Sequence, residues 1–289
     1  MDLVVGATGH LGGVIANRLL EQGSGVRVLV REGSDYSDLE AAGAELAIGD
    51  LKDLQSLTAA CRDAQRVIAT ATAALRGGDD TVEAVDRSGY QNLIAAAEAN
   101  AIQQFVFVSA HGFAPDSGPA LSQAKGATEA AIRESALDYT ILRPTLFMEA
   151  WISMVIGSQL QTGRRVTVVG DPDRAYGFIA SQNVADLALA VLGLSAASRA
   201  TIPWSTSPVS YRQIVQWIEQ AIGEPIVIDS IPPGETVPGL PPIVNQLWSY
   251  AAEGGIPPIE TLQTAEQFGI RLITPEEYIQ QAFSSDFSG

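Results

Sequence analysis

Three glycines near the start of the chain have a spacing that suits a nucleotide-phosphate site. A short apolar run ends in the pattern Gly6-x-x-Gly9-x-x-Gly12, and the apolar residues of 14–20 then recur at helical spacing. A glycine turn between a strand and a helix lets the backbone approach a pyrophosphate, whose charge then lies against N–H groups at the positive end of the helix. The stretch therefore predicts a dinucleotide site, with a purely structural turn as the alternative.

The residue that ends the second strand indicates which dinucleotide is held. An arginine there favours a 2′-phosphate, whereas an acid favours a ribose hydroxyl. In this chain Arg31 comes directly after the strand expected over 26–30, and Glu32 follows it. We therefore predict NADP(H) as the preferred cofactor, with NAD(H) as the alternative; a solvated surface arginine is the plain structural interpretation.

Two further strand ends carry residues suited to a cofactor. Asp50 and Leu51 follow the third strand, where an adenine edge would lie, although a helix-start carboxylate is an equally simple interpretation of Asp50. Asp53 begins the next helix and is expected to cap it. Thr70 and Ala71 follow the fourth strand and are small enough for close passage of the cofactor, as in many ordinary loops.

The first half of the chain alternates β-branched runs with helical segments. Near-continuous runs of this kind are typical of strands buried on both faces of a parallel sheet. The alternation predicts an α/β fold, a doubly wound, mostly parallel Rossmann sheet. The expected strands are the run before Gly6 and residues 26–30, 45–49, 66–70, 105–109 and 139–143, with later helices at 35–42, from 53, 82–100 and 121–135.

Beyond Pro144 this rhythm changes. We predict an NAD(P)-binding Rossmann domain over residues 1–145 and a smaller α+β substrate-binding cap over 146–289, closely packed, with segments returning to the sheet. The last residues, 284–289, are expected to be loose. In the cap we expect helices at 146–161, 184–194, 211–222, 243–252 and 275–283, and strands at 166–169, 176–179, 200–204 and 225–231.

Composition excludes several classes of function. The formal net charge of −16 argues against nucleic acid or an anionic membrane as partner, because both would repel the chain. Cys61 is the single cysteine, so no internal disulfide is expected, and two histidines make no metal cluster. No apolar run has the length of a membrane span, and the first strand leaves no room for a signal peptide. We expect a cytoplasmic protein.

Several motifs together resemble the NmrA-like branch of the atypical short-chain dehydrogenases and reductases. That branch includes NADPH-dependent quinone reductases and NADPH-sensing regulators. The resemblance is specific as far as Trp151 and looser afterwards. It is carried by residues 6–13, 28–31, 49–51, 107–109, Lys125 with Glu129, 139–144 and 147–149.

The resemblance implies roles for matched residues. The pyrophosphate would lie on the glycine turn, and Arg31 would hold the 2′-phosphate. Ser109 would lie beside the nicotinamide ribose, Lys125 would bond the ribose hydroxyls, and the loop from Pro144 through Phe147 to Met148 would flank the ring. The turn residues concerned are Gly6, Thr8, Gly9, His10, Leu11 and Gly12.

One departure leaves the chemistry open. Ordinary members of the wider superfamily use Tyr-x-x-x-Lys, but Leu121 stands four residues before Lys125. Lys125 could itself act as acid or base, or the protons could come from water, or the chain binds the cofactor without turnover. A surface lysine paired with Glu129 at i+4 is the structural alternative.

The substrate side is predicted on a loop and a helix. His111 follows Ser109 on the loop, as a candidate acid or a structural residue. A hydrolase is improbable because the chain has no Gly-x-Ser-x-Gly elbow. An apolar pocket over the nicotinamide would be lined by Phe113, Phe147, Met148 and Trp151, for which core packing is the alternative.

We predict an NADPH-dependent oxidoreductase that transfers a hydride to a quinone or another apolar carbonyl acceptor. The acceptor would stack between the 109–113 loop and the 147–151 segment. The alternative is an NADP(H)-sensing regulatory protein with little or no turnover. A homodimer is an open alternative to a monomer.

Overall fold

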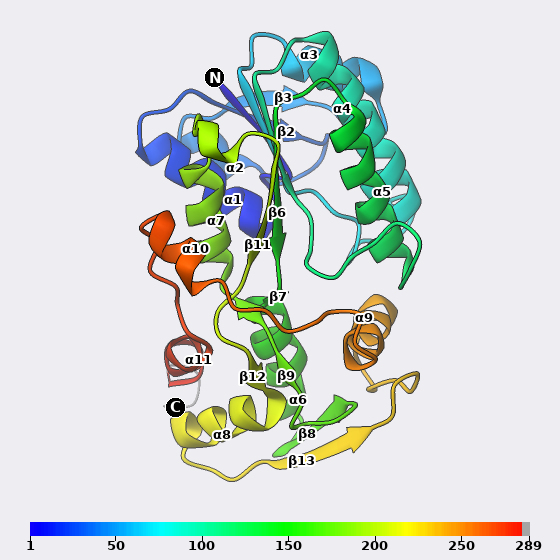
Figure 1. Ribbon diagram of the computed structural model, residues 1–289, viewed down its shortest axis with the longest axis vertical. Coiled ribbons are helices and arrows are strands. Elements are labelled where there is room, and N and C mark those ends of the chain that lie inside the picture. The colour runs from blue at the N-terminus through cyan, green and yellow to red at the C-terminus, as the bar shows by residue number, and fades with distance from the viewer. Residues whose placement is uncertain (285–289) are drawn as a thin grey trace. The chain divides into compact units, whose positions relative to one another are not determined.

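The structure is a computed structural model that describes residues 1–284, and it divides the chain into two compact units (Figure 1). The first unit contains residues 1–143 together with 184–202. The second contains 144–183 and the described chain from 203 onward. The expectation for the chain end, 284–289, lies outside the described residues apart from Ser284, which ends the last helix.

The first unit is built on a seven-stranded sheet with the strand order β11-β6-β5-β4-β1-β2-β3. The six strands from β3 to β6 pair in parallel, with Val4 level with Val28 on one side and with Ile68 on the other. This confirms the predicted Rossmann sheet. The strands are β1 (Asp2–Val5), β2 (Val26–Val30), β3 (Glu45–Ile48), β4 (Arg66–Ala69), β5 (Gln104–Val108), β6 (Tyr139–Pro144) and β11 (Ala200–Trp204).

Helices cover both faces of this sheet (Figure 1). Helices α1 (His10–Glu21), α2 (Ser37–Ala41) and α7 (Ser181–Ala190) lie on one side, and α3 (Leu54–Cys61), α4 (Tyr90–Ala99) and α5 (Ala120–Glu134) lie on the other. Alternate residues of each strand face opposite ways. Leu3, Phe105 and Phe107 belong to the core on the α3–α5 side, and all three are fully buried.

The helix predicted at 82–100 is two segments of different winding. A π-helical segment, η1 (Glu83–Gly89), precedes α4. Asp53 caps α3 as predicted, since its carboxylate accepts hydrogen bonds from the amides of Gln55 and Ser56. Asp50 does not cap this helix.

The second unit contains three small two-stranded sheets, β10-β7, β12-β9 and β13-β8. The helix predicted at 146–161 is replaced at its start by β7, because Leu146 and Phe147 pair in parallel with β10. Strand β12 and helix α10 were not predicted. The elements are β7 (Leu146–Phe147), η2 (Glu149–Ile156), α6 (Gly157–Leu160), β8 (Arg165–Val169), β9 (Ala175–Tyr176), β10 (Phe178–Ile179), β12 (Val209–Ser210), α8 (Tyr211–Ile222), β13 (Val227–Ile231), α9 (Pro242–Ala252), α10 (Leu262–Gln267) and α11 (Pro275–Ser284).

Aromatic rings in tilted and edge-to-face contacts form part of the core of the second unit. Tyr211 lies 5.1 Å from Trp248 and 5.3 Å from Tyr176, measured between ring centroids. Trp151 meets Trp248 edge to face at 5.8 Å. Within residues 1–284, no helix is both long and apolar enough to cross a membrane.

Candidate dinucleotide site

The glycine turn lies between β1 and α1 and presents the start of that helix. Gly6 has a φ of +96°, a conformation that favours glycine. The Gly9 amide donates to the Gly6 carbonyl at 2.9 Å and closes the turn. Gly9 is also the N-cap of α1 and supplies no side-chain cap, whereas the first turn of any helix has N–H groups without intrahelical acceptors. His10, Leu11 and Gly12 form this first turn, so an anionic group is suited to it.

Close packing shows why two of the glycines are required. A Cβ on Gly12 would lie 2.2 Å from the Gly6 carbonyl oxygen, and one on Gly6 would lie 2.7 Å from the Ala71 amide nitrogen. The turn, the helix and the loop after β4 therefore meet at backbone distance. This cradle, which a side chain would fill, fits a dinucleotide pyrophosphate.

An open pocket extends from the turn across the ends of β2, β3 and β4. It encloses about 450 Å³, part of which is open solvent. The pocket contains six of the predicted cofactor residues. Thr70 is not in its lining, and the Thr70 hydroxyl donates to the carbonyl of the lining residue Val5 at 3.2 Å. Its lining residues are Val5, Gly6, Thr8, Leu29, Arg31, Gly49, Asp50, Leu51, Ala71, Thr72, Arg76, Asp80 and Val85.

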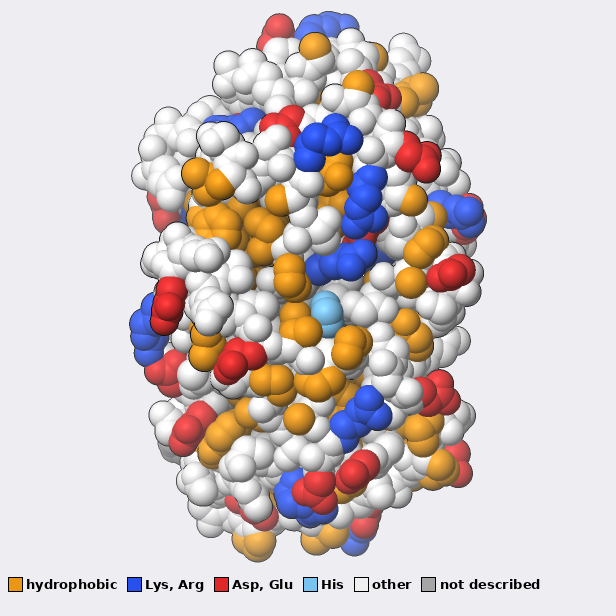
Figure 2. Space-filling view, in the orientation of Figure 1, with side chains coloured by type: hydrophobic (Ala, Val, Ile, Leu, Met, Phe, Trp, Pro, Cys, Tyr) orange, Lys and Arg blue, Asp and Glu red, His pale blue; other side chains and the backbone are white. Residues whose placement is uncertain are grey.

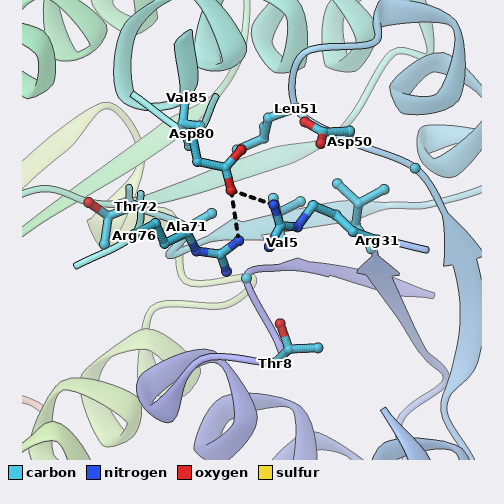
Figure 3. A pocket seen from close by; sticks show the side chains of 13 residues that line it. Val5, Thr8, Arg31, Asp50, Leu51, Ala71, Thr72, Arg76, Asp80 and Val85 are labelled. Atoms are coloured by element: carbon cyan, nitrogen blue, oxygen red, sulfur yellow. Dashed lines mark hydrogen bonds and ion pairs between the residues drawn. The ribbon is translucent and has the colours of Figure 1, made fainter. Parts of the chain in front are cut away.

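Three basic side chains converge on Asp80, and Figure 3 shows two of them, Arg31 and Arg76, with the carboxylate between them. Asp80 forms ion pairs with Arg31, with Lys52 at 2.7 Å and with Arg76 at 3.4 Å. The hydrogen bond from Lys52, followed by that from Arg31, lowers the pKa of Asp80 to about 2, against the opposing effect of burial. Figure 2 shows Lys and Arg side chains gathered in the upper half of the visible face.

Of these four charged residues, only Arg31 was predicted from the sequence as a cofactor residue. Asp80 and Arg76 lie on the loop between β4 and η1, and Lys52 follows β3. Lys52 could have been predicted as a site residue, because it is one of only two lysines in the chain and directly follows the predicted site residue Leu51.

Side chains of η1 and α4 hold the pocket loop that follows β4 in place. The Asp86 carboxylate accepts from the Ala73 amide at 2.9 Å, and the Tyr90 hydroxyl donates to the Ala71 carbonyl at 2.7 Å. Both side chains are fully buried. Their attachment fixes the backbone that approaches Gly6.

Lys125 is buried, so the alternative of a surface lysine is wrong. It is 7 % exposed, and its ammonium donates to the Val108 carbonyl at 3.1 Å. The ammonium also lies 5.1 Å from the centroid of the Phe107 ring. Burial lowers the pKa of Lys125, and the nearby carboxylates of Asp86 and Glu129 oppose this shift. The charge of this lysine is therefore held in a low-dielectric interior close to the end of β5.

Glu129 pairs with arginines and forms no ion pair with Lys125. Its buried carboxylate binds Arg133 and Arg143. Burial favours the neutral acid, but hydrogen bonds from Arg143 and Arg133 hold the pKa of Glu129 below its usual value. Ser109 is itself buried, at the end of β5.

The loop that follows Ser109 is held against α5. The Ala114 amide donates to the Ser122 hydroxyl at 3.1 Å, and a Cβ on Gly126 would lie 2.3 Å from the Pro115 nitrogen. His111 is half-buried on this loop and Phe113 is buried. Leu121 is buried on α5, where the wider superfamily places its tyrosine.

The remaining predicted residues belong to the second unit. Pro144 is buried at the end of β6, and Phe147 is half-buried in β7. Met148 is fully buried, and Trp151 packs on Trp248. Both side chains therefore contribute to core packing, and their place in an acceptor pocket stays a prediction.

Known proteins resemble the chain in sequence and fold. It is 31% identical to the photosystem II assembly factor Ycf39 of Synechocystis sp. over 80% of this chain and 70% of that protein. It is 30% identical to an NAD(P)H azoreductase of Xenophilus azovorans, over 52% of this chain and 49% of the relative.

Solved structures share the fold. An NADPH-dependent quinone oxidoreductase of Escherichia coli, in complex with NADPH, superimposes with a TM-score of 0.82 at 18% identity, over 98% of this chain and 100% of the other. A triphenylmethane reductase of Citrobacter sp., complexed with NADP(H), gives a TM-score of 0.81 at 21% identity, over 98% and 100%.

A family defined by NAD(P)H binding matches residues 6–193, which include the glycine turn, the pocket and Lys125. The match covers more than half of the chain. The chain therefore belongs to this NAD(P)H-binding family.

Proposed function

We propose that this protein is an NADPH-dependent reductase whose acceptor is a quinone or another apolar carbonyl compound. The observation that carries the proposal is the group of basic side chains at the 2′ end of the dinucleotide pocket. A glycine turn serves any dinucleotide, but three cations at this end favour the phosphorylated one. NAD(H) remains the competing cofactor because Glu32 follows Arg31.

The cofactor residues divide according to the part of the nucleotide they would hold. Gly6, Thr8 and the first turn of α1 would bind the pyrophosphate, and Arg31 the 2′-phosphate. Asp50 and Leu51 would border the adenine. Bound NADPH would supply the hydride, and reduction of a quinone would also take up a proton to give the hydroquinone and NADP⁺.

Lys125 is the proposed source of that proton, with water as the alternative. Its ammonium is buried next to the end of β5, and burial lowers its pKa toward the range in which it can exchange a proton. Ser109 would contact the nicotinamide ribose. The roles of His111, Phe113, Pro144, Phe147, Met148 and Trp151 at the ring and acceptor remain part of the proposal.

A second candidate is an NADP(H)-binding protein that acts through a partner, with little or no turnover. Leu121 in place of the tyrosine favours it, and so does the 31% identical relative named as an assembly factor. We propose a cytoplasmic location. Because that relative is named as a photosystem II assembly factor, a site of action near photosystem II is the alternative.

Fluorescence titration with NADPH, followed by addition of quinones, aldehydes and azo dyes, separates the two candidates. The reductase predicts binding and then acceptor-dependent loss of NADPH absorbance, and Lys125→Met should lower this rate by a larger factor than it weakens NADPH binding. Binding of NADP⁺ and NADPH without oxidation by any acceptor of the panel contradicts the reductase and supports the binding protein.

A further inference from the structure

The charge balance of the Asp80 cluster is unusual. Three cations, Arg31, Lys52 and Arg76, pair with Asp80 within a chain of formal net charge −16, and Lys52 also lies 3.7 Å from the carboxylate of Asp50. Two carboxylates face three cations, which leaves positive charge in excess. A phosphate monoester carries about −1.5 to −2 near pH 7 and has three acceptor oxygens, so it matches three cationic donors better.

The position of the carboxylate matters as much as its charge. The Asp80 side chain is 11 % exposed and lies inside the lining of the pocket, between the guanidinium groups of Arg31 and Arg76 (Figure 3). It therefore occupies the point on which the basic groups converge, where an anionic ligand would lie.

We propose that Arg31, Lys52 and Arg76 together form the 2′-phosphate site and that Asp80 is its internal competitor, a carboxylate that the phosphate displaces on binding. The inference rests on the proposed cofactor, and it adds two binding residues and one specificity-determining residue. NADH has no group that competes for the cations, so Asp80 keeps its ion pairs when NADH binds. Asp80 thereby weakens the binding of NADPH selectively.

The loop has room for the displacement. Gly77 and Gly78 precede Asp80, and a Cβ on either would meet no atom within 4 Å. Gly78 has a φ of +66°. The ion pairs hold the carboxylate, while the loop that carries it is free of close packing at these two positions.

The charge of Asp80 persists at physiological pH. Its pKa of about 2 keeps the carboxylate ionised far below neutrality. Displacement therefore depends on competition between two anions and not on protonation of Asp80. The 2′-phosphate itself titrates with a pKa of about 6, so only the effect of Asp80→Asn on affinity should show no titration of this carboxyl near neutrality.

The test is calorimetric titration of Asp80→Asn with NADPH, NADH, adenosine 2′,5′-bisphosphate and adenosine 5′-monophosphate. We expect NADPH and the bisphosphate to bind about 5–10-fold more tightly than in the unchanged chain, with NADH and the monophosphate within about twofold. Asp80→Glu keeps the negative charge and should stay near the original affinities. Lys52→Met and Arg76→Met should each weaken the two 2′-phosphorylated ligands alone.

Asp79→Asn is the matched control, because it removes the same charge from an exposed residue next to Asp80. Weaker or unchanged NADPH binding by Asp80→Asn overturns the inference, as does an equal gain by Asp79→Asn or for NADH. Calorimetry also keeps the two proposals distinct. The expected binding pattern without turnover contradicts the reductase alone, and turnover with no effect of Asp80 contradicts the inference alone.

Discussion

Asp86 and Tyr90 lie one turn apart and hold the same loop, Asp86 by accepting from the Ala73 amide and Tyr90 by donating to the Ala71 carbonyl. Through this pair, the helical segment after β4 fixes the backbone that faces the glycine turn. Both side chains are fully buried, Asp86 in the π-helical segment η1 and Tyr90 at the start of α4. Such windings often occur at functional sites.

Tyr90→Phe should therefore impair both stability and cofactor binding. The change removes the hydroxyl that donates to the Ala71 carbonyl, at a cost of about 1–2 kcal/mol in unfolding free energy. NADPH should bind several-fold more weakly because the loop relaxes. Urea denaturation and fluorescence titration measure the two effects. Tyr36→Phe, at a half-buried residue elsewhere in this unit, serves as the control, and equal behaviour of the two variants would contradict the role of the hydroxyl.

Gly12→Ala should disrupt the turn. Its Cβ would lie 2.2 Å from the Gly6 carbonyl oxygen, so the first turn of α1 must move away from β1. Overpacking of this kind costs about 1–3 kcal/mol or more, and the displaced helix should lose nucleotide binding. Gly25→Ala is the control, because its Cβ would have its nearest neighbour at 4.0 Å. Thermal denaturation and calorimetry compare the two, and intact NADPH binding by Gly12→Ala would show that the turn is not the cradle.

Lys125 should give the reaction a basic pH limit. If its ammonium donates the proton, the rate falls as pH rises through the lysine pKa, which burial places below the usual 10.5. This fall in rate at basic pH should disappear in Lys125→Met, whose rate should be lower and should show no titration of a lysine. Steady-state rates with a quinone from pH 6 to 10 measure it. An unchanged fall in rate in the variant would assign the proton to water.

Glu129→Gln should lower stability in a pH-dependent manner. The folded-state pKa of Glu129 is lowered, so its stabilising contribution is present above the unfolded-state pKa of about 4.5 and is lost as pH falls through the folded-state value. We expect a loss of about 1–2 kcal/mol at pH 7, limited because Arg133 and Arg143 are partly exposed and can rehydrate. Urea denaturation at pH 7 and at pH 3 tests this. A loss that stays constant between the two would contradict the ion-pair account.

Cys61 should be unreactive until the first unit unfolds. The thiol is fully buried, and burial raises its pKa to about 11, so little reactive thiolate exists at neutral pH. Iodoacetamide should label the native protein very slowly and the urea-unfolded chain rapidly. Because Cys61 is the single cysteine, the labelling rate reports on this site alone. Rapid labelling of the native protein would show that α3 opens locally.

Local pattern was sufficient for the framework of this protein. Continuous β-branched runs require burial on both faces, and this requirement specifies parallel strands separated by helices. The spacing Gly6-x-x-Gly9-x-x-Gly12 specifies a turn with no room for side chains. Arg31 was predicted as a cofactor residue because it directly follows the second predicted strand. These features depend on neighbouring residues, so they can be read along the chain. The short strands β7 and β12 depend on distant partners and were missed.

Tertiary structure decided the features that require distant residues to meet. Asp80 is separated from Arg31 by 49 positions, and only the folded sheet brings the ends of β2, β3 and β4 to one pocket. Burial of Lys125 also depends on the packing of α5 against β5, because helical spacing alone allows a surface pair with Glu129. The electrostatic energy and the desolvation of a side chain depend on all the groups around it in space. The sequence therefore supplied the chemical groups, and the fold determined which of them interact.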